Sequence, residues 1–203
     1  MSPRIRAAPS SMGEGDDEPP FFTIGHSNRS IADFLALLGE AGVEVVVDIR
    51  KMPMSRAHPH FNGAALSGAL AGAGIGYEHE AALGGLRGRA EALPAAVNGS
   101  WTDRSFHNYA DYALSQPFRL GLERLLALGR ERRAAIMCSE AVWWRCHRRI
   151  VADYLIAGGK TVFHIMGPGR IERARLTQGA LVQPDGTVLY PAAGEAATTG
   201  SSG

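Results

Sequence analysis

Titratable and nucleophilic side chains follow three short apolar runs of the chain, at residues 21–25, 43–49 and 134–138. The strands of a parallel sheet end at the same edge, and ligands of open α/β sheets bind beyond that edge. We therefore expect the polar residues at the ends of these runs to form one site. The candidates are His26, Ser27, Asp48, Arg50, Ser55, Cys138 and Glu140.

Asp48 and Arg50 are two positions apart at the end of the second run, so in a strand both side chains point to the same face of the sheet. Such a pair could clamp an anion or orient a catalytic base. It could equally be a structural ion pair, because charge pairs are enriched at functional sites but are not confined to them. The sequence leaves both interpretations open.

A second cluster, Cys146, His147 and Arg148, lies where the last long helix is expected to begin. A thiol at a helix N-terminus has a lowered pKa, which makes Cys146 a candidate nucleophile, with His147 and Arg148 as ligand-binding groups. The alternative is a buried structural cysteine, which is our interpretation of Cys138. Cys138, Cys146 and His147 also offer three soft metal ligands. The paired spacing of structural zinc sites is absent, so the sequence assigns no metal.

Gly84 and Gly85 begin a long loop, at 84–104, and could approach a phosphate closely. This is not a P-loop, because the Gly-Lys-Ser/Thr ending is missing. Tyr109 could stack on a base of the ligand. The helical spacing of Phe106 and Tyr109 also fits a packed core.

Strand-like and helix-like patterns alternate along the chain and predict a single α/β domain over 21–190. The expected fold is a three-layer sandwich with a mainly parallel central sheet, Rossmann-like or flavodoxin-like. Residues 1–20 are predicted to be a disordered leader and 191–203 a flexible tail. The expected strands are 21–25, 43–49, 76–78, 134–138 and 161–165, and the expected helices are 30–38, 64–71, 106–114, 118–128 and 146–157. A terminal hairpin is expected at 181–190.

The composition is that of an ordinary globular protein, with 203 residues, 45% hydrophobic residues and a net charge of +1. The near-neutral charge argues against a strongly electrostatic nucleic-acid binder. No run of about 18 apolar residues occurs, so we expect no membrane partner. Two cysteines and no apolar export signal predict a reducing, cytoplasmic environment.

Several of these segments also carry a family resemblance. TIGHSN at 23–28, VDIRKMPMS at 47–55, LGG at 83–85, CSE at 138–140 and CHRR at 146–149 together resemble the family called domain of unknown function 488. The similarity covers roughly 22–165 and implies an intracellular bacterial or archaeal α/β domain. No activity comes with it. The polar positions that characterise the family are those at the predicted strand ends.

These observations favour an enzyme-like site for a phosphorylated or nucleotide-like small molecule. Arg50 and Arg148 would hold the anion. The expected acid–base groups are Asp48, Glu140 and His26, and the expected nucleophile is Cys146 or Ser27. The sequence indicates no particular cofactor and no oligomeric state.

Two other classes of function remain open. One is a nucleic-acid-binding or nucleic-acid-modification accessory module without catalysis of its own, whose basic groups would be Arg87, Arg89, Arg104, Arg145 and Arg149. The other is a protein-interaction domain that retains a vestigial site, because a fold does not by itself imply a function.

Overall fold

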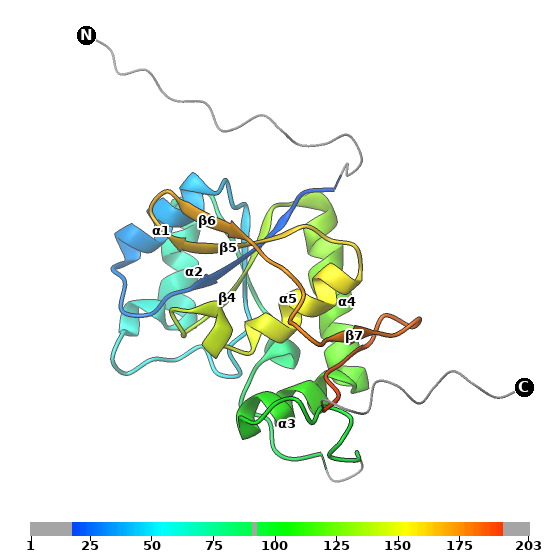
Figure 1. Cartoon of the computed structure of the whole chain (residues 1–203). Coiled ribbons are helices and arrows are strands. Elements are labelled where there is room, and N and C mark those ends of the chain that lie inside the picture. The colour runs from blue at the N-terminus through cyan, green and yellow to red at the C-terminus, as the bar shows by residue number, and fades with distance from the viewer. Residues whose placement is uncertain (1–17, 91–92, 193–203) are drawn as a thin grey trace, which may run out of the picture.

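The computed structural model describes residues 18–90 and 93–192, and in this part of the chain six strands form one sheet (Figure 1). The strands are β1 (Phe21–Gly25), β2 (Val45–Asp48), β3 (Gly76–His79), β4 (Ala134–Cys138), β5 (Val162–Gly167) and β6 (Arg170–Arg173). The helices are α1 (Ile31–Glu40), α2 (Gly63–Gly72), α3 (Arg104–Ala113), α4 (Gln116–Glu131) and α5 (Arg148–Ala157). Short 3-10 helices occupy Pro59–Phe61, Ala81–Leu83 and Trp143–Arg145.

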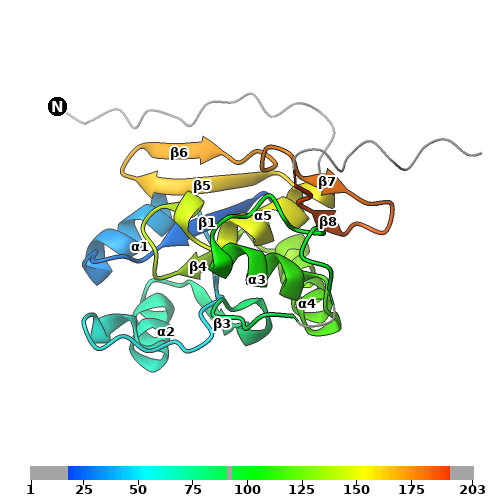
Figure 2. The same ribbon diagram turned by 60° about the horizontal axis from the view of Figure 1, so that its bottom comes forward.

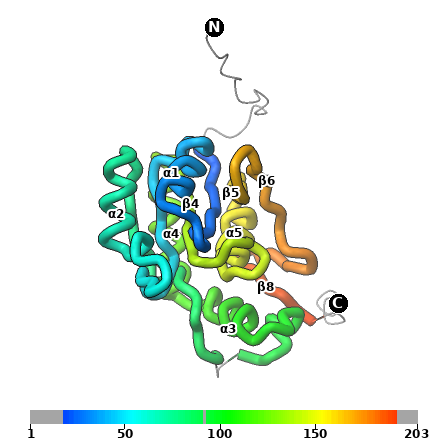
Figure 3. The backbone as a smooth tube through the Cα atoms, turned by 90° about the vertical axis from the view of Figure 1, so that its left-hand side faces the viewer, coloured from blue at the N-terminus to red at the C-terminus, as the bar shows by residue number. Residues whose placement is uncertain are grey.

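The predicted three-layer α/β sandwich is confirmed. Alternate residues of the central strands are buried on opposite faces, and each face has its own layer of helices. One apolar cluster joins α1 and α2 to Phe22, Ile24 and Val46. The other joins α3, α4 and α5 to Phe21 and Val45. Figure 1 shows α1 and α2 on one side of the strands and α4 and α5 on the other, and Figure 3 views the molecule from the α1 and α2 side.

The order of the strands across the sheet is β3-β2-β4-β1-β5-β6. It matches neither the Rossmann-like order 3-2-1-4-5-6 nor the flavodoxin-like order 2-1-3-4-5. The difference is that β4 lies between β1 and β2 and pairs with both in parallel. Three strand ends that carry candidate site residues are therefore direct neighbours.

The sequence patterns located most elements to within a few residues. Ser30 caps α1 as expected, because its hydroxyl accepts a hydrogen bond from the Asp33 backbone N–H at 3.1 Å. The strand β6 was not predicted. It runs antiparallel to β5 at the sheet edge, and Figure 2 shows the two side by side. Its sequence is Arg-Ile-Glu-Arg, and a single apolar residue gives no readable alternation.

The C-terminal hairpin is present as β7 (Leu181–Val182) and β8 (Val188–Leu189). Val188 and Tyr190 are buried in the same cluster as α5. The predicted leader and tail fall almost entirely outside the described residues. Within residues 18–90 and 93–192, no helix is both long enough and apolar enough to cross a membrane.

His164 is a buried titratable group in β5, away from the strand ends. Its Nδ1 lies 2.8 Å from the Thr23 hydroxyl, and its ring stacks on Trp143 with 4.4 Å between the centroids. Burial, together with the Arg148 charge, lowers the pKa of His164 from 6.5 to about 4. The ring is therefore neutral in the folded protein at neutral pH.

This burial predicts a loss of stability in mild acid. The unfolded chain binds a proton at His164 near pH 6.5, whereas the folded protein does so only near pH 4. Stability attributable to this residue is therefore complete above pH 6.5 and falls by up to about 3 kcal/mol as the pH drops to 4. His164→Asn should lower stability at pH 7 but flatten this part of the pH dependence, as measured by urea unfolding. His58→Asn is the control, and an unchanged pH slope in His164→Asn would contradict the prediction.

Candidate functional site

A cavity of about 610 Å³ lies at the carboxyl ends of β2, β4 and β1, beside α3 and the start of α5. It is where the sequence analysis placed a site. Nine of the predicted residues line it: His26, Arg50, Ser55, Gly85, Tyr109, Cys138, Glu140, Cys146 and His147. The other four, Ser27, Asp48, Gly84 and Arg148, are not among its lining residues.

Backbone pairing continues past the strand ends and holds the cavity floor together. The His26 N–H donates to the Cys138 carbonyl at 2.9 Å, and the Ile49 N–H donates to the Met137 carbonyl at 3.0 Å. Cys138 is thereby held between the segments that carry His26 and Arg50.

Asp48 is an anchor for Arg50 rather than an exposed acid or base. Its carboxylate accepts hydrogen bonds from Arg50 Nε at 2.9 Å, from the Arg50 backbone N–H at 3.0 Å and from the Tyr77 hydroxyl at 2.9 Å. The carboxylate is fully buried. This geometry does not favour the predicted acid–base role of Asp48, because its oxygens are occupied and it is not among the cavity-lining residues. The alternative of a structural ion pair is the one that the geometry supports.

Arg50 is held from several directions with its guanidinium on the cavity wall. Besides Asp48, its Nη2 donates to the Phe61 carbonyl at 2.8 Å, and its Nη1 lies 3.4 Å from His26 Nε2. The guanidinium is rigid, because the ion pair and the carbonyl both constrain its plane.

His26 packs flat against Phe61, with 4.3 Å between the ring centroids. Its Nδ1 is 2.9 Å from the Ser27 carbonyl oxygen, which can only accept, so the proton resides on Nδ1 and Nε2 has the lone pair. Burial lowers the pKa of His26, and the charge of Arg50 lowers it further. The ring is therefore a neutral hydrogen-bond acceptor toward Arg50.

Arg148 supports a loop, and its position does not favour the predicted role in holding an anion. Its guanidinium is buried and donates to the Glu140 carbonyl at 2.6 Å and to the Ala141 carbonyl at 2.9 Å. Gly25 permits this arrangement, because a β-carbon there would overlap the Glu140 carbonyl. The side chain of Glu140 is exposed at the cavity wall.

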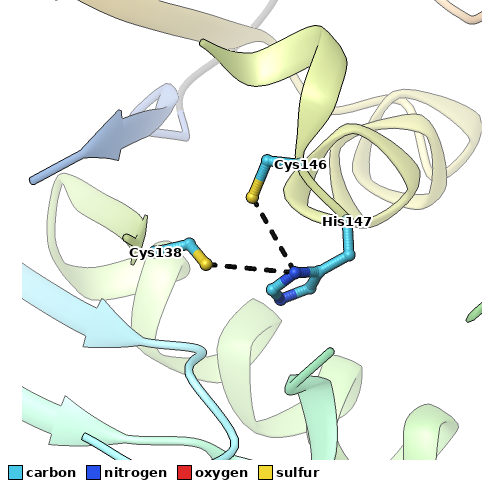
Figure 4. Close-up of side chains that lie close together, drawn as sticks. All are labelled: Cys138, Cys146 and His147. Atoms are coloured by element: carbon cyan, nitrogen blue, oxygen red, sulfur yellow. Dashed lines mark hydrogen bonds between the residues drawn. The ribbon is translucent and has the colours of Figure 1, made fainter. Parts of the chain in front are cut away.

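Two cysteines and one histidine converge on one wall of the cavity (Figure 4). Cys138 ends β4, whereas Cys146 and His147 directly precede α5. His147 Nδ1 lies 3.9 Å from Cys138 Sγ and 3.8 Å from Cys146 Sγ. Both cysteines are buried and free. The spacing of eight residues in the chain gave no indication of this proximity.

The acidity of the two thiols is the reverse of the expectation. Burial raises the pKa of Cys146, whereas a side-chain hydrogen bond with Cys146 lowers the pKa of Cys138. Cys146 lies before the first turn of α5 but is more than nine-tenths buried, and desolvation outweighs the effect of the helix end. Cys138, interpreted from the sequence as inert packing, is the more acidic thiol and lines the cavity.

The glycine pair at 84 and 85 packs against protein groups. A β-carbon on Gly84 would lie 2.8 Å from the backbone of Lys51, and one on Gly85 would lie 2.8 Å from His147 Nδ1. The next residue, Leu86, has a positive φ of 56° and is 87% exposed at the cavity mouth. This conformation costs a residue other than glycine about 1 kcal/mol.

The remaining predicted residues differ in their hydrogen bonds and in whether they line the cavity. The Tyr109 hydroxyl donates to the Leu83 carbonyl at 2.6 Å, and Tyr109 is a core residue that also lines the cavity. The Ser55 hydroxyl accepts from the His58 N–H at 3.0 Å. Ser27 is not among the cavity-lining residues, and its hydroxyl donates to Asn28 Oδ1 at 3.3 Å.

Eight further residues line the cavity and were not among the residues predicted for the small-molecule site: Lys51, Met52, Met54, Leu86, Ser105, Phe106, Ser139 and Arg145. Five of them adjoin predicted positions, so extending each strand-end segment by a few residues would have found them. Ser105 and Phe106 belong to the start of α3. The sequence predicted a helix at 106–114 but did not indicate that it packs beside the strand ends.

The buried ion pair generates a testable prediction. Asp48→Asn keeps the volume but leaves the buried Arg50 charge without its counter-ion, so the protein should lose about 3 kcal/mol of stability in urea unfolding. The control is Glu172→Gln, which removes the exposed partner of Arg170, also two residues away, and should cost less than about 1 kcal/mol. Equal effects of the two changes would show that Asp48 is not the counter-ion, and its acid–base role would be reopened.

The chain was compared with protein families, curated proteins and solved structures. No match to the chain was found among the curated proteins or among the solved structures. A family described as "Domain of unknown function DUF488" matches residues 30–155, which is more than half of the chain. The match includes Arg50, Cys138, Cys146 and His147, and it ends within α5. The chain therefore belongs to the DUF488 family.

Proposed function

We propose that the cavity binds a small anionic compound of the phosphorylated or nucleotide-like class. The observation that carries the proposal is the charge of the lining: Arg50, Lys51 and Arg145 are cationic, and Glu140 is the one carboxylate among the lining residues of the described chain. Lys51 and Arg145 are exposed at the mouth, where a ligand can reach them. Cations around a concave site attract anions and raise their local concentration.

Arg50 supports the proposal in a different way. Asp48 balances its charge, yet Nη1 has two N–H groups and among the described residues is engaged only weakly, by His26 Nε2 at 3.4 Å. A phosphate or carboxylate oxygen would give this group a strong acceptor. The guanidinium is already immobilised by Asp48 and Phe61, so little side-chain entropy is lost on binding.

The mouth of the cavity adds an apolar component. Met52, Met54 and Leu86 are 69%, 71% and 87% exposed and border the same opening as the cations. Large exposed apolar side chains that cluster at a cavity indicate a surface for ligand contact. A ligand with an anionic group and an apolar or aromatic part, such as a nucleotide, would use both features.

A small ligand is favoured over a nucleic acid because two of the five rim arginines form contacts within the protein. Arg87 donates to the Gly84 and Ala81 carbonyls and lies over the Tyr112 ring at 3.7 Å. Arg149 donates to Thr177 and lies over the Trp101 ring at 4.9 Å. These groups stabilise loops and are poorly placed to track a phosphate backbone.

The test compares charged ligands with their uncharged counterparts. In isothermal titration calorimetry, AMP should bind and adenosine should not. Ribose 5-phosphate should likewise bind more tightly than ribose. In the double variant Lys51→Ala/Arg145→Ala, binding of the phosphorylated compound should weaken at least about tenfold, because two charge-assisted contacts are lost.

The matched control is Arg119→Ala/Arg130→Ala, which removes two exposed arginines of α4 outside the cavity. This variant should bind as the wild type does at the same ionic strength. Equal weakening in both double variants would show that binding depends on the net charge of the protein and not on these two side chains, which would contradict the proposal. Equal binding of AMP and adenosine would also overturn it.

A further inference from the structure

Cys138, Cys146 and His147 have the geometry of a metal-binding set. Their three ligand atoms all lie within 4.8 Å of one another, with His147 Nδ1 at 3.9 Å and 3.8 Å from the two sulfurs. In a tetrahedral zinc site, Zn–S bonds of about 2.3 Å and Zn–N bonds of about 2.0 Å place neighbouring ligand atoms about 3.5–3.8 Å apart. The side chains therefore need only small rotations to surround one ion.

The tautomer of His147 is set by a group outside this cluster. Its Nε2 lies 3.2 Å from the Ile49 carbonyl oxygen. A carbonyl can only accept a hydrogen bond, so the proton is on Nε2, and Nδ1 directs its lone pair toward the two sulfurs. Histidines that bind metals in proteins are oriented in this way, with the second nitrogen donating to a carbonyl or carboxylate.

Gly85 keeps the space near Nδ1 free. A β-carbon at this position would lie 2.8 Å from Nδ1 and 3.2 Å from the neighbouring ring carbon, within van der Waals overlap. Glycine is thus the residue type at position 85 that leaves His147 undisturbed. All three ligand residues also line the cavity, so one side of the cluster opens into it.

We propose that Cys138, Cys146 and His147 bind one Zn²⁺ ion, with a fourth coordination position that faces the cavity. Two thiolates balance the charge of the ion, and a set of two sulfurs and one imidazole suits zinc among the common divalent metals. Three protein ligands with an open position are typical of zinc sites that take up water or a substrate oxygen. The open position faces the space assigned above to the anion, although zinc binding itself does not require that assignment.

Zinc binding is tested on the full chain after removal of metal with EDTA in the presence of a reductant. Titration with Zn²⁺ against a chromophoric chelator should give one tightly bound ion per chain. Co²⁺ in place of Zn²⁺ should give thiolate-to-cobalt charge-transfer absorption together with the visible bands of a tetrahedral ion. No saturable uptake of either metal by the reduced protein would overturn the proposal, and this result does not depend on any variant.

Variants assign the ligands. Cys146→Ser should weaken zinc binding by more than about hundredfold and reduce the charge-transfer absorption by about half, because one of two thiolates is lost. His147→Gln should weaken binding while it keeps the thiolate absorption. His107→Gln, on α3, is the control and should bind zinc as the wild type does. Circular dichroism of the metal-free variants verifies their fold.

Two outcomes would contradict the assignment directly. One is charge-transfer absorption of full strength in Cys146→Ser. The other is conversion of both thiols to a Cys138–Cys146 disulfide with no uptake of zinc by the reduced form. Zinc uptake is measured without any phosphorylated compound, and AMP binding is measured on the metal-free protein, so a failure of the anion proposal and a failure of the metal proposal remain distinguishable.

Discussion

The parallel pairing of β4 with both β1 and β2 is the interaction on which the rest of the site depends. It makes the ends of these three strands neighbours and aligns Gly25 with Cys138 and Asp48 with Met137. The hydrogen bonds that continue from His26 and Ile49 extend the ladder into the loops. A strand order with β1 beside β2 would separate Cys138 from Arg50 by the width of another strand, about 5 Å.

The buried charges near the cavity are arranged so that each has a partner behind the wall. Asp48 balances Arg50 from the side away from the cavity, and the Glu140 and Ala141 carbonyls accept hydrogen bonds from Nη1 and Nη2 of Arg148. The buried Nε of Arg148 has no hydrogen-bond partner among the described residues. His26 remains neutral because it is buried and lies near a cation. The groups that remain accessible are Lys51, Arg145 and Glu140 at the rim. The wall is therefore rigid and preorganised, which is the property that a polar binding site requires.

Close backbone approach is the second requirement of the site. At Gly25 the Glu140 carbonyl occupies the place of a side chain, and at Gly84 the backbone of Lys51 does so. These contacts bring three loops together without intervening side chains. In the sequence, Gly84 and Gly85 indicated a close approach correctly but suggested a phosphate as the neighbour. The tertiary structure supplies Lys51 and His147 instead, because the loop folds back onto the strand ends.

The sequence by itself determined the layered α/β fold, most strand and helix positions and the edge of the sheet at which polar residues gather, because periodicity and apolar runs reflect local burial. It did not determine the strand order, the edge strand β6 or the roles of Asp48, Arg148 and the two cysteines. Those depend on contacts between residues distant in the chain, such as Tyr77 with Asp48 and His147 with Ile49. They also depend on loop conformations that bring Arg148 to Glu140 and Cys138 to His147. Burial and hydrogen-bond partners set the charge and reactivity of a side chain, and only the tertiary structure decided them.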